Sequence, residues 1–211
     1  MIDQSARKPA RKSRSERPSK RPPKPLDSAR LEELALAYVA RFATTRLKLE
    51  AYLMRKLRER GWDEDGAADG GEDADEIGKV RVADIAERMV AAGYVDDAAY
   101  ARAKSGSLLR RGYGAARVSQ ALGMAGVSED LREDVRPGGD AQRRAALTMA
   151  RKRRFGPFGA AVPDRARREK QIAAMLRAGH RLDNARVLVD APTVEAAEDW
   201  AAQASEDSCE D

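Results

Sequence analysis

Paired carboxylates and histidine are the residues that most often carry acid–base or metal chemistry, and this sequence offers one candidate of each kind. Asp96 and Asp97 are adjacent carboxylates, and His180 is the single histidine of the chain. Neighbours at the start of a helix do not face each other, and no third acidic ligand stands nearby, so the pair fits helix capping better than metal binding. His180 follows a glycine suited to end a helix, where a partly buried structural imidazole is expected more often than a catalyst.

Nucleotide-binding loops and metal-binding cysteines are also missing from the sequence. Gly112-Tyr113-Gly114 lacks the preceding strand and the third glycine of a dinucleotide-binding loop, and there is no Gly-Lys-Ser phosphate loop. The single cysteine, Cys209, excludes an internal disulfide and lies in a polar tail that does not suit a structural zinc site. We therefore predict a binding protein that is not an enzyme and that uses no cofactor or metal.

Two groups of cations beside aromatic residues carry the functional prediction. Guanidinium groups pair with phosphates or carboxylates, and a ring can stack on a base or fill a pocket. The alternative is a solvated helix face whose cations complement the helix dipole. We favour the functional interpretation because of the charge of the chain's body. The groups are Arg110, Arg111, Tyr113 and Arg117, and Arg151, Lys152, Arg153, Arg154 and Phe155.

Charge is strongly segregated along the chain, whose formal net charge is +5. Residues 1–30 carry +7, while segments 63–76 and 190–211 carry −8 each, which leaves +14 for the rest. A basic body beside acidic segments indicates an anionic partner, for which the acidic segments can compete. The alternative for an acidic run is a solubilising segment.

The composition and the spacing of apolar residues predict an all-α fold. Alanine and leucine dominate the apolar residues, and aromatic residues make up only 5% of the chain, so small helix-on-helix contacts are favoured over a sheet core. Asp96 is the expected N-cap of a helix that ends at Gly112. The next helix has Val118, Leu122 and Ala125 on one face and ends at Gly126.

A helix-ending pattern recurs along the chain. Glycine follows a bulky apolar residue by four positions at Leu57–Gly61, Leu122–Gly126 and Met175–Gly179. We therefore predict three tandem three-helix repeats in an elongated, curved array. Each repeat is too small to bury its own apolar faces, so stacking against its neighbour is expected. The predicted segments are a disordered basic tail at 1–26, repeats at 27–93 (with an acidic insert at 63–78), 94–137 and 138–190, and a loosely held acidic tail at 191–211.

The central part of the sequence resembles a known family. The run G-Y-V-D-D at 93–97, followed by R-R-G-Y-G-A-A-R-V-x-Q-A-L at 110–122 and A-G-V-S at 125–128, is similar to the central repeat of the RecX family, the bacterial regulators of the RecA recombinase. The resemblance covers about residues 31–190. It implies a protein that binds the RecA nucleoprotein filament along its helical groove and restrains filament growth, ATP turnover, recombination and co-protease activity. The acidic insert and the basic N-terminal extension depart from the family pattern.

The predicted partner-binding residues combine the two cationic groups with positions from the stretch that resembles the family. Tyr94 is compatible with a core or an interface position, and for a tyrosine the core is the commoner. The set is Tyr94, Asp96, Asp97, Arg102, Arg110, Arg111, Tyr113, Arg117, Arg151, Lys152, Arg153 and Arg154.

Two other classes of function remain open from the residues alone. One is a basic helical protein that binds nucleic acid by itself, for which a consecutive helix pair could serve as a helix-turn-helix. The other is a hydrolase or transferase with an unrecognised site. We expect a cytoplasmic protein, because no apolar run is long enough to cross a membrane. We also expect a monomer whose partners are the RecA filament, as the resemblance implies, and single-stranded DNA, through the basic surface.

Overall fold

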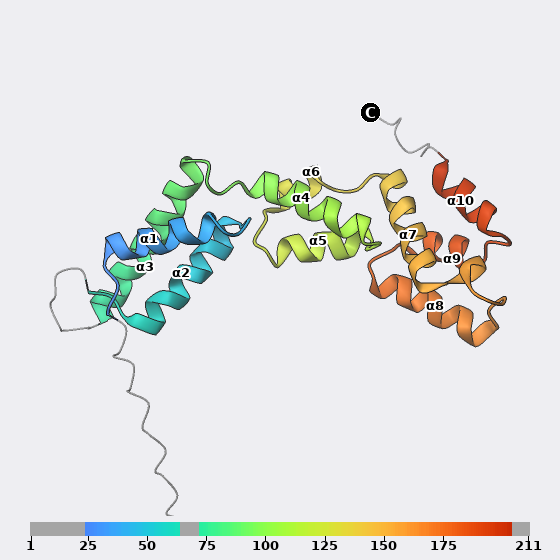
Figure 1. Cartoon of the computed structure of the whole chain (residues 1–211), viewed down its shortest axis with the longest axis horizontal. Coiled ribbons are helices and arrows are strands. Elements are labelled where there is room, and N and C mark those ends of the chain that lie inside the picture. Colours follow the sequence, from blue (N-terminus) through green and yellow to red (C-terminus); the bar gives the residue numbers. More distant parts are fainter. Residues whose placement is uncertain (1–23, 64–71, 204–211) are drawn as a thin grey trace, which may run out of the picture.

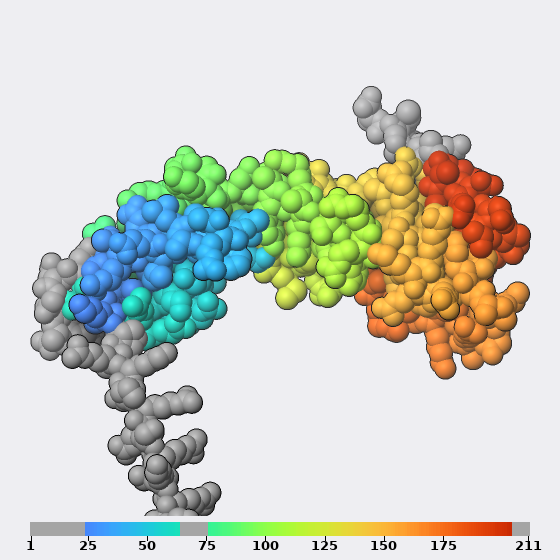
Figure 2. Space-filling model, in the orientation of Figure 1, coloured from blue at the N-terminus to red at the C-terminus, as the bar shows by residue number. Residues whose placement is uncertain are grey.

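The computed structural model describes residues 24–63 and 72–203, and most of these residues form helices. No β-strand forms in this part of the chain, where one isolated parallel bridge joins Leu26 to Trp62. The helices follow one another in an extended arch, with the first repeat at one end and the third at the other (Figure 1). The space-filling view shows the same curved outline (Figure 2). The predicted elongated all-α fold is confirmed.

Each predicted repeat contains three helices in the same order. The first has α1 (Ser28–Val39), α2 (Arg46–Arg60) and α3 (Glu72–Ala91). The second has α4 (Asp97–Arg110), α5 (Ala115–Gly123) and α6 (Glu129–Asp134). The third has α7 (Gly139–Arg153), α8 (Arg165–Arg177) and α9 (Leu182–Val189), with a 3-10 turn (Gly156–Phe158) after α7, and α10 (Val194–Ala202) follows it.

Side-chain caps start most of these helices. The Asp96 carboxylate accepts from the Ala99 amide at 2.8 Å, so its predicted role as the N-cap of α4 is confirmed. Asp27, Thr45 and Ser128 cap α1, α2 and α6 in the same way. Each cap gives an acceptor to a backbone amide that the helix itself cannot satisfy.

Every repeat has a core of its own. Buried side chains gather in three separate clusters, one for each repeat. The largest fully buried side chains include Leu53 and Ile85 in the first repeat, Leu122 in the second, and Met175 and Leu188 in the third. The expectation that a repeat must bury its apolar faces against its neighbour is therefore wrong: three short helices enclose a small core by themselves, and the repeats meet through helix ends.

A glycine with positive φ follows the second helix of each repeat, as the recurrent pattern predicted. Gly61, Gly126 and Gly179 have φ of 76°, 80° and 90°, a region in which a side chain is strained. The residue after each glycine is buried, and the amides of Val127 and His180 bond back to the carbonyls of Leu122 and Met175 at 3.1 Å. The equivalent ends identify α2, α5 and α8 as counterparts.

These counterparts lie end to end. At the joint between the second and third repeats, the Gly114 amide donates to the Ala178 carbonyl at 2.9 Å and the Ala116 amide donates to the Gly179 carbonyl at 3.2 Å. Amides at the start of α5 thus bond to the carbonyls of the two residues that follow α8, with the two helix dipoles aligned head to tail. The row of α2, α5 and α8 runs along the lower side of the arch (Figure 1).

The joint between the first and second repeats also lies between the start of one second helix, α2, and the end of another, α5. Here side chains make the hydrogen bonds that backbone groups make at the second joint. The Thr45 hydroxyl, at the N-cap of α2, donates to the Ala125 carbonyl at the end of α5. The Arg46 amide, the first of α2, donates to the Asp97 carboxylate at 2.9 Å. Asp97 therefore belongs to the helix termini of two repeats, a role that its sequence position alone did not predict.

Backbone contact at the second joint leaves no room for side chains. A β-carbon at Gly114 would lie 2.2 Å from the Gly179 carbonyl oxygen, and one at Gly179 would lie 2.3 Å from the Arg117 amide nitrogen. Because the atoms in the way belong to the backbone, no rotamer change can relieve the overlap. The joint therefore requires glycine on both sides.

His180 completes the second joint as a buried structural residue. Its side chain is 6% exposed, and Nε2 lies 3.0 Å from the Gly112 carbonyl oxygen at the end of α4. Nε2 therefore carries the proton and donates to this carbonyl. Burial lowers the pKa of the imidazole, because removal from water disfavours the charged form.

Two predicted segments fall partly inside the described residues. Helix α3 begins at Glu72, within the predicted insert of 63–78, so the insert's later acidic residues lie on a helix and residues 64–71 lie outside the described part. Of the predicted acidic tail 191–211, residues 194–202 form α10, which packs on α7 with Ala197 and Ala201 buried. Trp200 also packs against the third core. The predicted basic tail lies largely outside the described residues.

We predict that Gly114→Ala lowers the free energy of unfolding by about 1 to 3 kcal/mol, the usual cost of overpacking, and opens the second joint. Chemical denaturation measures the loss, and small-angle X-ray scattering measures an increase in the radius of gyration. Gly123→Ala, at the other end of α5, is the matched control, since its β-carbon would meet its nearest neighbour at 3.6 Å. Equal stability and equal size of the two variants would contradict a backbone-limited joint.

We predict that stability falls on acidification through the range where His180 titrates. The folded-state pKa is lowered, so the unfolded chain binds a proton first, and stability that is present above the ordinary pKa of about 6.5 is lost as pH falls through the folded pKa. Denaturation at several pH values between about 5 and 7.5, with the ring protons followed by NMR, measures this loss. His180→Gln should remove the dependence in this range, and an unchanged profile in that variant would refute the assignment.

Candidate partner-binding surface

The first cationic cluster lies at the end of α4. Gly112, with a φ of 88°, turns the chain, and the Tyr113 amide bonds back to the Leu108 carbonyl at 3.1 Å. This turn leaves Arg110 and Arg111 exposed in the last turn of the helix. The Arg111 guanidinium lies 5.3 Å from the centre of the Tyr113 ring, so the predicted pairing of a cation with a ring is present here.

The second cationic cluster lies at the end of α7. Arg154 ends the helix in the left-handed conformation, with φ 56° and ψ 49°, and residues 151–154 are all exposed. Arg151 stands over the ring of Phe158 at 5.8 Å and pairs with Glu198 of α10. Phe155, which the sequence suggested as the neighbouring ring, packs instead against the core of the third repeat.

The fold brings the two clusters together although they are 40 residues apart. Lys152 Nζ donates to the Arg111 carbonyl at 3.3 Å. Beneath this contact, a β-carbon at Gly112 would lie 2.9 Å from the Met149 amide nitrogen, so the ends of α4 and α7 touch. Together they form one cationic surface across the second joint, which we call the basic ridge: Arg110, Arg111, Arg151, Lys152, Arg153 and Arg154.

Most of the charge on the basic ridge is uncompensated. Arg151 has Glu198 as a partner. Within residues 24–63 and 72–203, the other five members have no carboxylate within ion-pair distance. Five exposed cations on two helix ends that touch repel one another, so this arrangement favours the approach of an anionic surface.

The remaining predicted residues lie elsewhere. Arg102 is exposed on α4, and Arg117 lies on α5 at the second joint, where its guanidinium donates to Gln120 at 2.7 Å. Tyr94 precedes α4 and is 60% exposed, so the core position that is commoner for tyrosine does not apply. Asp96 and Asp97 cap helices at the same end of α4. Since α4 has 14 residues, about 20 Å separates this end from the basic ridge.

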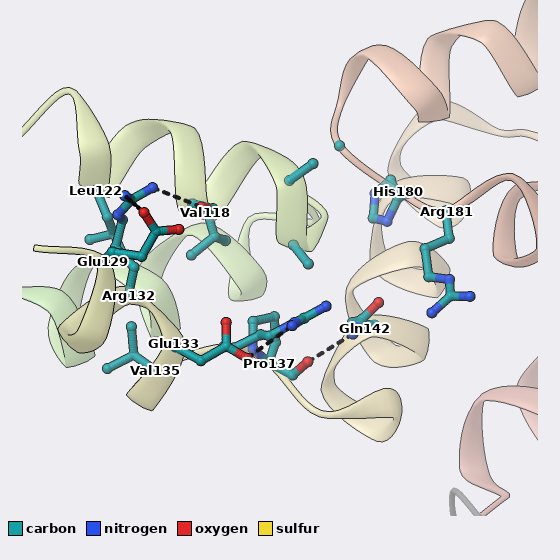
Figure 3. Close-up of a pocket in the computed structure, with 15 residues that line it drawn as sticks. Val118, Leu122, Glu129, Arg132, Glu133, Val135, Pro137, Gln142, His180 and Arg181 are labelled. Carbon is teal, nitrogen blue, oxygen red and sulfur yellow. Dashed lines mark hydrogen bonds and ion pairs between the residues drawn. The ribbon is translucent and has the colours of Figure 1, made fainter. Parts of the chain in front are cut away.

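A cavity of about 410 Å³ also opens at the second joint and was not predicted from the sequence (Figure 3). Val118 and Leu122 of α5 and Arg132 of α6 line one side, and His180 and Arg181 line the other. Arg132 is part-buried, with Glu129 at 3.5 Å, and its Nε has no hydrogen-bond partner among the described residues. No sequence motif marks these residues, because they come from two helices and from the turn between α8 and α9.

The described residues offer little for catalysis. Among them, no group of three or more potential metal-binding side chains comes together. The one histidine is engaged at the joint, and Asp96 and Asp97 hold backbone amides. In the part of the chain that the structure describes, no helix is long and apolar enough to span a membrane.

Known proteins match this chain both in sequence and in fold. The family model for the second three-helix domain of RecX matches residues 96–135. The chain is 31% identical over 183 residues to the regulatory protein RecX of Myxococcus xanthus, covering 84% of this chain and 92% of that one. It is 32% identical over 161 residues to the regulatory protein RecX of Agrobacterium fabrum, covering 74% and 78%.

Solved structures share the fold. The crystal structure of RecX from Lactobacillus salivarius superimposes with a TM-score of 0.56 at 19% identity, over 77% of this chain and 94% of that one. A second crystal structure of a regulatory protein RecX gives 0.55 at 21% identity, over 77% and 71%. With the shared three-helix repeats and two relatives that match most of its length, this chain belongs to the RecX family of regulatory proteins.

Proposed function

We propose that this protein binds the RecA nucleoprotein filament and restrains its recombinase, ATPase and co-protease activities. The observation that carries the proposal is the basic ridge, where five uncompensated cations from two repeats meet at one joint. Such a surface suits an anionic partner, and arginine in particular suits carboxylates and phosphates because of its planar, forked donors. Family membership supplies the identity of that partner.

The architecture supports contact with more than one protomer of a filament. Each repeat has its own core, so each can present a rigid surface, while the joints consist of helix ends with few apolar contacts. An arch of such units can follow a curved, repetitive surface and meet equivalent positions on successive protomers. Bridging of this kind would hold neighbouring protomers in one arrangement and so oppose the changes that accompany filament growth and ATP turnover.

A regulatory role agrees with the absence of a recognisable catalytic constellation in the described residues, and binding is then the whole activity. The proposal implies a cytoplasmic protein, since the filament forms on cellular DNA. We propose that a single copy suffices, because the repeats within one chain already supply the repetition that a filament offers.

A second candidate is direct binding of nucleic acid without recombinase. The Arg111 guanidinium packed over the Tyr113 ring favours it, because cations beside a ring are also found where proteins bind single strands. Fluorescence anisotropy with labelled single-stranded DNA, in the presence and absence of recombinase, separates the two candidates. The filament proposal expects tight binding only with recombinase, whereas equal affinity without it would favour the second candidate.

We predict that Arg110→Glu combined with Arg111→Glu weakens binding to the filament at least about tenfold, since attraction becomes repulsion at an anionic surface. Inhibition of recombinase ATPase activity and filament anisotropy both measure the loss. Because both side chains are exposed, helicity measured by circular dichroism should be unchanged.

The control for this experiment is Arg165→Glu combined with Arg167→Glu at the start of α8. These arginines are also exposed, and the variant changes net charge by the same amount outside the basic ridge. The proposed role of the ridge fails if the two variants inhibit equally well, or if the ridge variant inhibits like the unmodified protein.

A further inference from the structure

Tyr94 is held on the surface by a rigid turn. Gly93, with a φ of 75°, ends α3, and the amides of Tyr94 and Val95 both bond to the Met89 carbonyl, at 2.9 and 3.2 Å. Val95 is 2% exposed and anchors the turn in the core of the first repeat. The 60% exposure of Tyr94 is therefore a property of a backbone that is held by the Met89 carbonyl and by the buried Val95.

A groove of about 590 Å³ lies beside this ring at the first joint. Its walls are small and apolar where Ala43, Ala99 and Ala103 contribute, and the rings of Tyr94 and Tyr100 add aromatic surface. Ala43 belongs to the link between α1 and α2, and the other residues to α4 and the turn before it. We call this feature the joint groove. Its volume and small walls suit one large apolar side chain from another molecule.

Lys104 gives the joint groove an unpaired positive charge. It lines the groove, is half-buried, and has no hydrogen-bond or ion-pair partner within residues 24–63 and 72–203. The other charged groups nearby are engaged: Asp96 accepts from the Ala99 amide, and Lys48 lies over the Tyr100 ring at 4.6 Å and contacts its hydroxyl. The Lys104 ammonium is thus available as a donor, and a carboxylate brought by an occupant would pair with it there.

The charge balance of the groove favours a protein occupant over nucleic acid. Lys104 is its one lining cation, Asp96 is also in the wall, and Asp97 follows directly. A nucleic-acid backbone carries a continuous series of phosphates, which these carboxylates would repel, and its usual binding sites are strongly positive. A single carboxylate beside an apolar side chain meets no such obstacle.

The groove also lies where two repeats are linked. Thr45 and Asp97 make the bonds of the first joint, and both are next to groove residues in the sequence. An occupant would touch the first repeat through the α1–α2 link and the second through α4. Its binding would therefore fix the angle between the two repeats.

We propose that the joint groove receives a segment of a filament protomer in which a large aliphatic or aromatic side chain stands next to a carboxylate. The apolar side chain lies between the tyrosine rings against the alanine walls, and the carboxylate pairs with Lys104. This inference rests on the proposed function and adds a second contact on α4, whose Lys104 lies six residues, about 9 Å along the helix axis, before Arg110 of the basic ridge.

Three single variants test the proposal: Ala103→Leu, which fills the groove; Tyr94→Ser, which removes the exposed ring; and Lys104→Glu, which reverses its charge. All three positions lie on the surface or half-buried, so the fold is preserved and circular dichroism should be unchanged. Each variant should bind recombinase filaments at least about tenfold more weakly, while binding to single-stranded DNA without recombinase stays the same.

Matched controls make the same chemical changes elsewhere. Ala37→Leu adds a leucine to an exposed site on α1, and Val162→Ser removes an apolar side chain that is 93% exposed. Lys170→Glu reverses an exposed charge on α8. Each control should bind filaments like the unmodified protein.

Three outcomes overturn the inference, and they are distinguishable. If the unmodified protein does not bind the filament, the proposed function fails together with the inference. If it binds and the groove variants bind equally well, the inference alone fails. If the groove variants lose affinity for free single-stranded DNA to the same extent, the groove is a nucleic-acid site and the assignment to a protein segment is wrong.

Discussion

The arrangement of this protein depends on the contact between the end of one second helix and the start of another. A helix leaves its first amides and last carbonyls without internal partners, and here groups at the two kinds of helix end meet across the repeats. The amides of Gly114 and Ala116 donate to the carbonyls of Ala178 and Gly179, directly after α8, and the Thr45 hydroxyl donates to the carbonyl of Ala125, shortly after α5. Aligned dipoles and satisfied backbone groups hold the repeats together where little apolar surface is shared.

This type of joint determines both the shape and the places where a partner can bind. Because each repeat encloses its own core, contact between repeats is confined to short stretches at helix ends. Exposed side chains from two repeats therefore lie next to each other at a joint. Lys152 of the third repeat, which contacts Arg111 of the second, is an example. The joint groove begins at the N-terminal end of α4 and the basic ridge begins with Arg110 at its C-terminal end, so one rigid helix carries both surfaces.

Acidic residues of the third repeat pair with some of its cations, including one cation of the basic ridge. Helix α10 is acidic, packs along α7, and supplies Glu198 to Arg151, so it neutralises one cation and leaves the others exposed. The Arg168 guanidinium likewise pairs with Asp190 and holds the pKa of that carboxyl below its ordinary value. Acidic residues near the C-terminus thus pair with cations of the third repeat. Their composition alone had suggested a loosely held tail, because composition does not show which cations they meet.

The helices, their ends and the family could be predicted from local features of the sequence. Capping by Asp96 and the left-handed glycines Gly61, Gly126 and Gly179 are local effects, which depend only on a few neighbouring residues and can therefore be read from the chain. The same local signals placed cationic clusters at helix ends, where Arg111 does stand over Tyr113. Resemblance in this stretch was enough to identify the RecX family, which relatives along most of the chain bear out.

Which of these positions meet depends on how the helices pack and could not be predicted from local features. Lys152 and Arg111 come together because glycine at 112 lets α7 approach, and Asp97 reaches the first amide of α2, 51 residues away in sequence. Whether an apolar face is buried within a repeat or between repeats, and whether Tyr94 points inward or outward, depends on how the helices pack. Packing is a sum over residues that are distant in sequence, so periodicity specifies the buried face of a helix but leaves its partner undetermined.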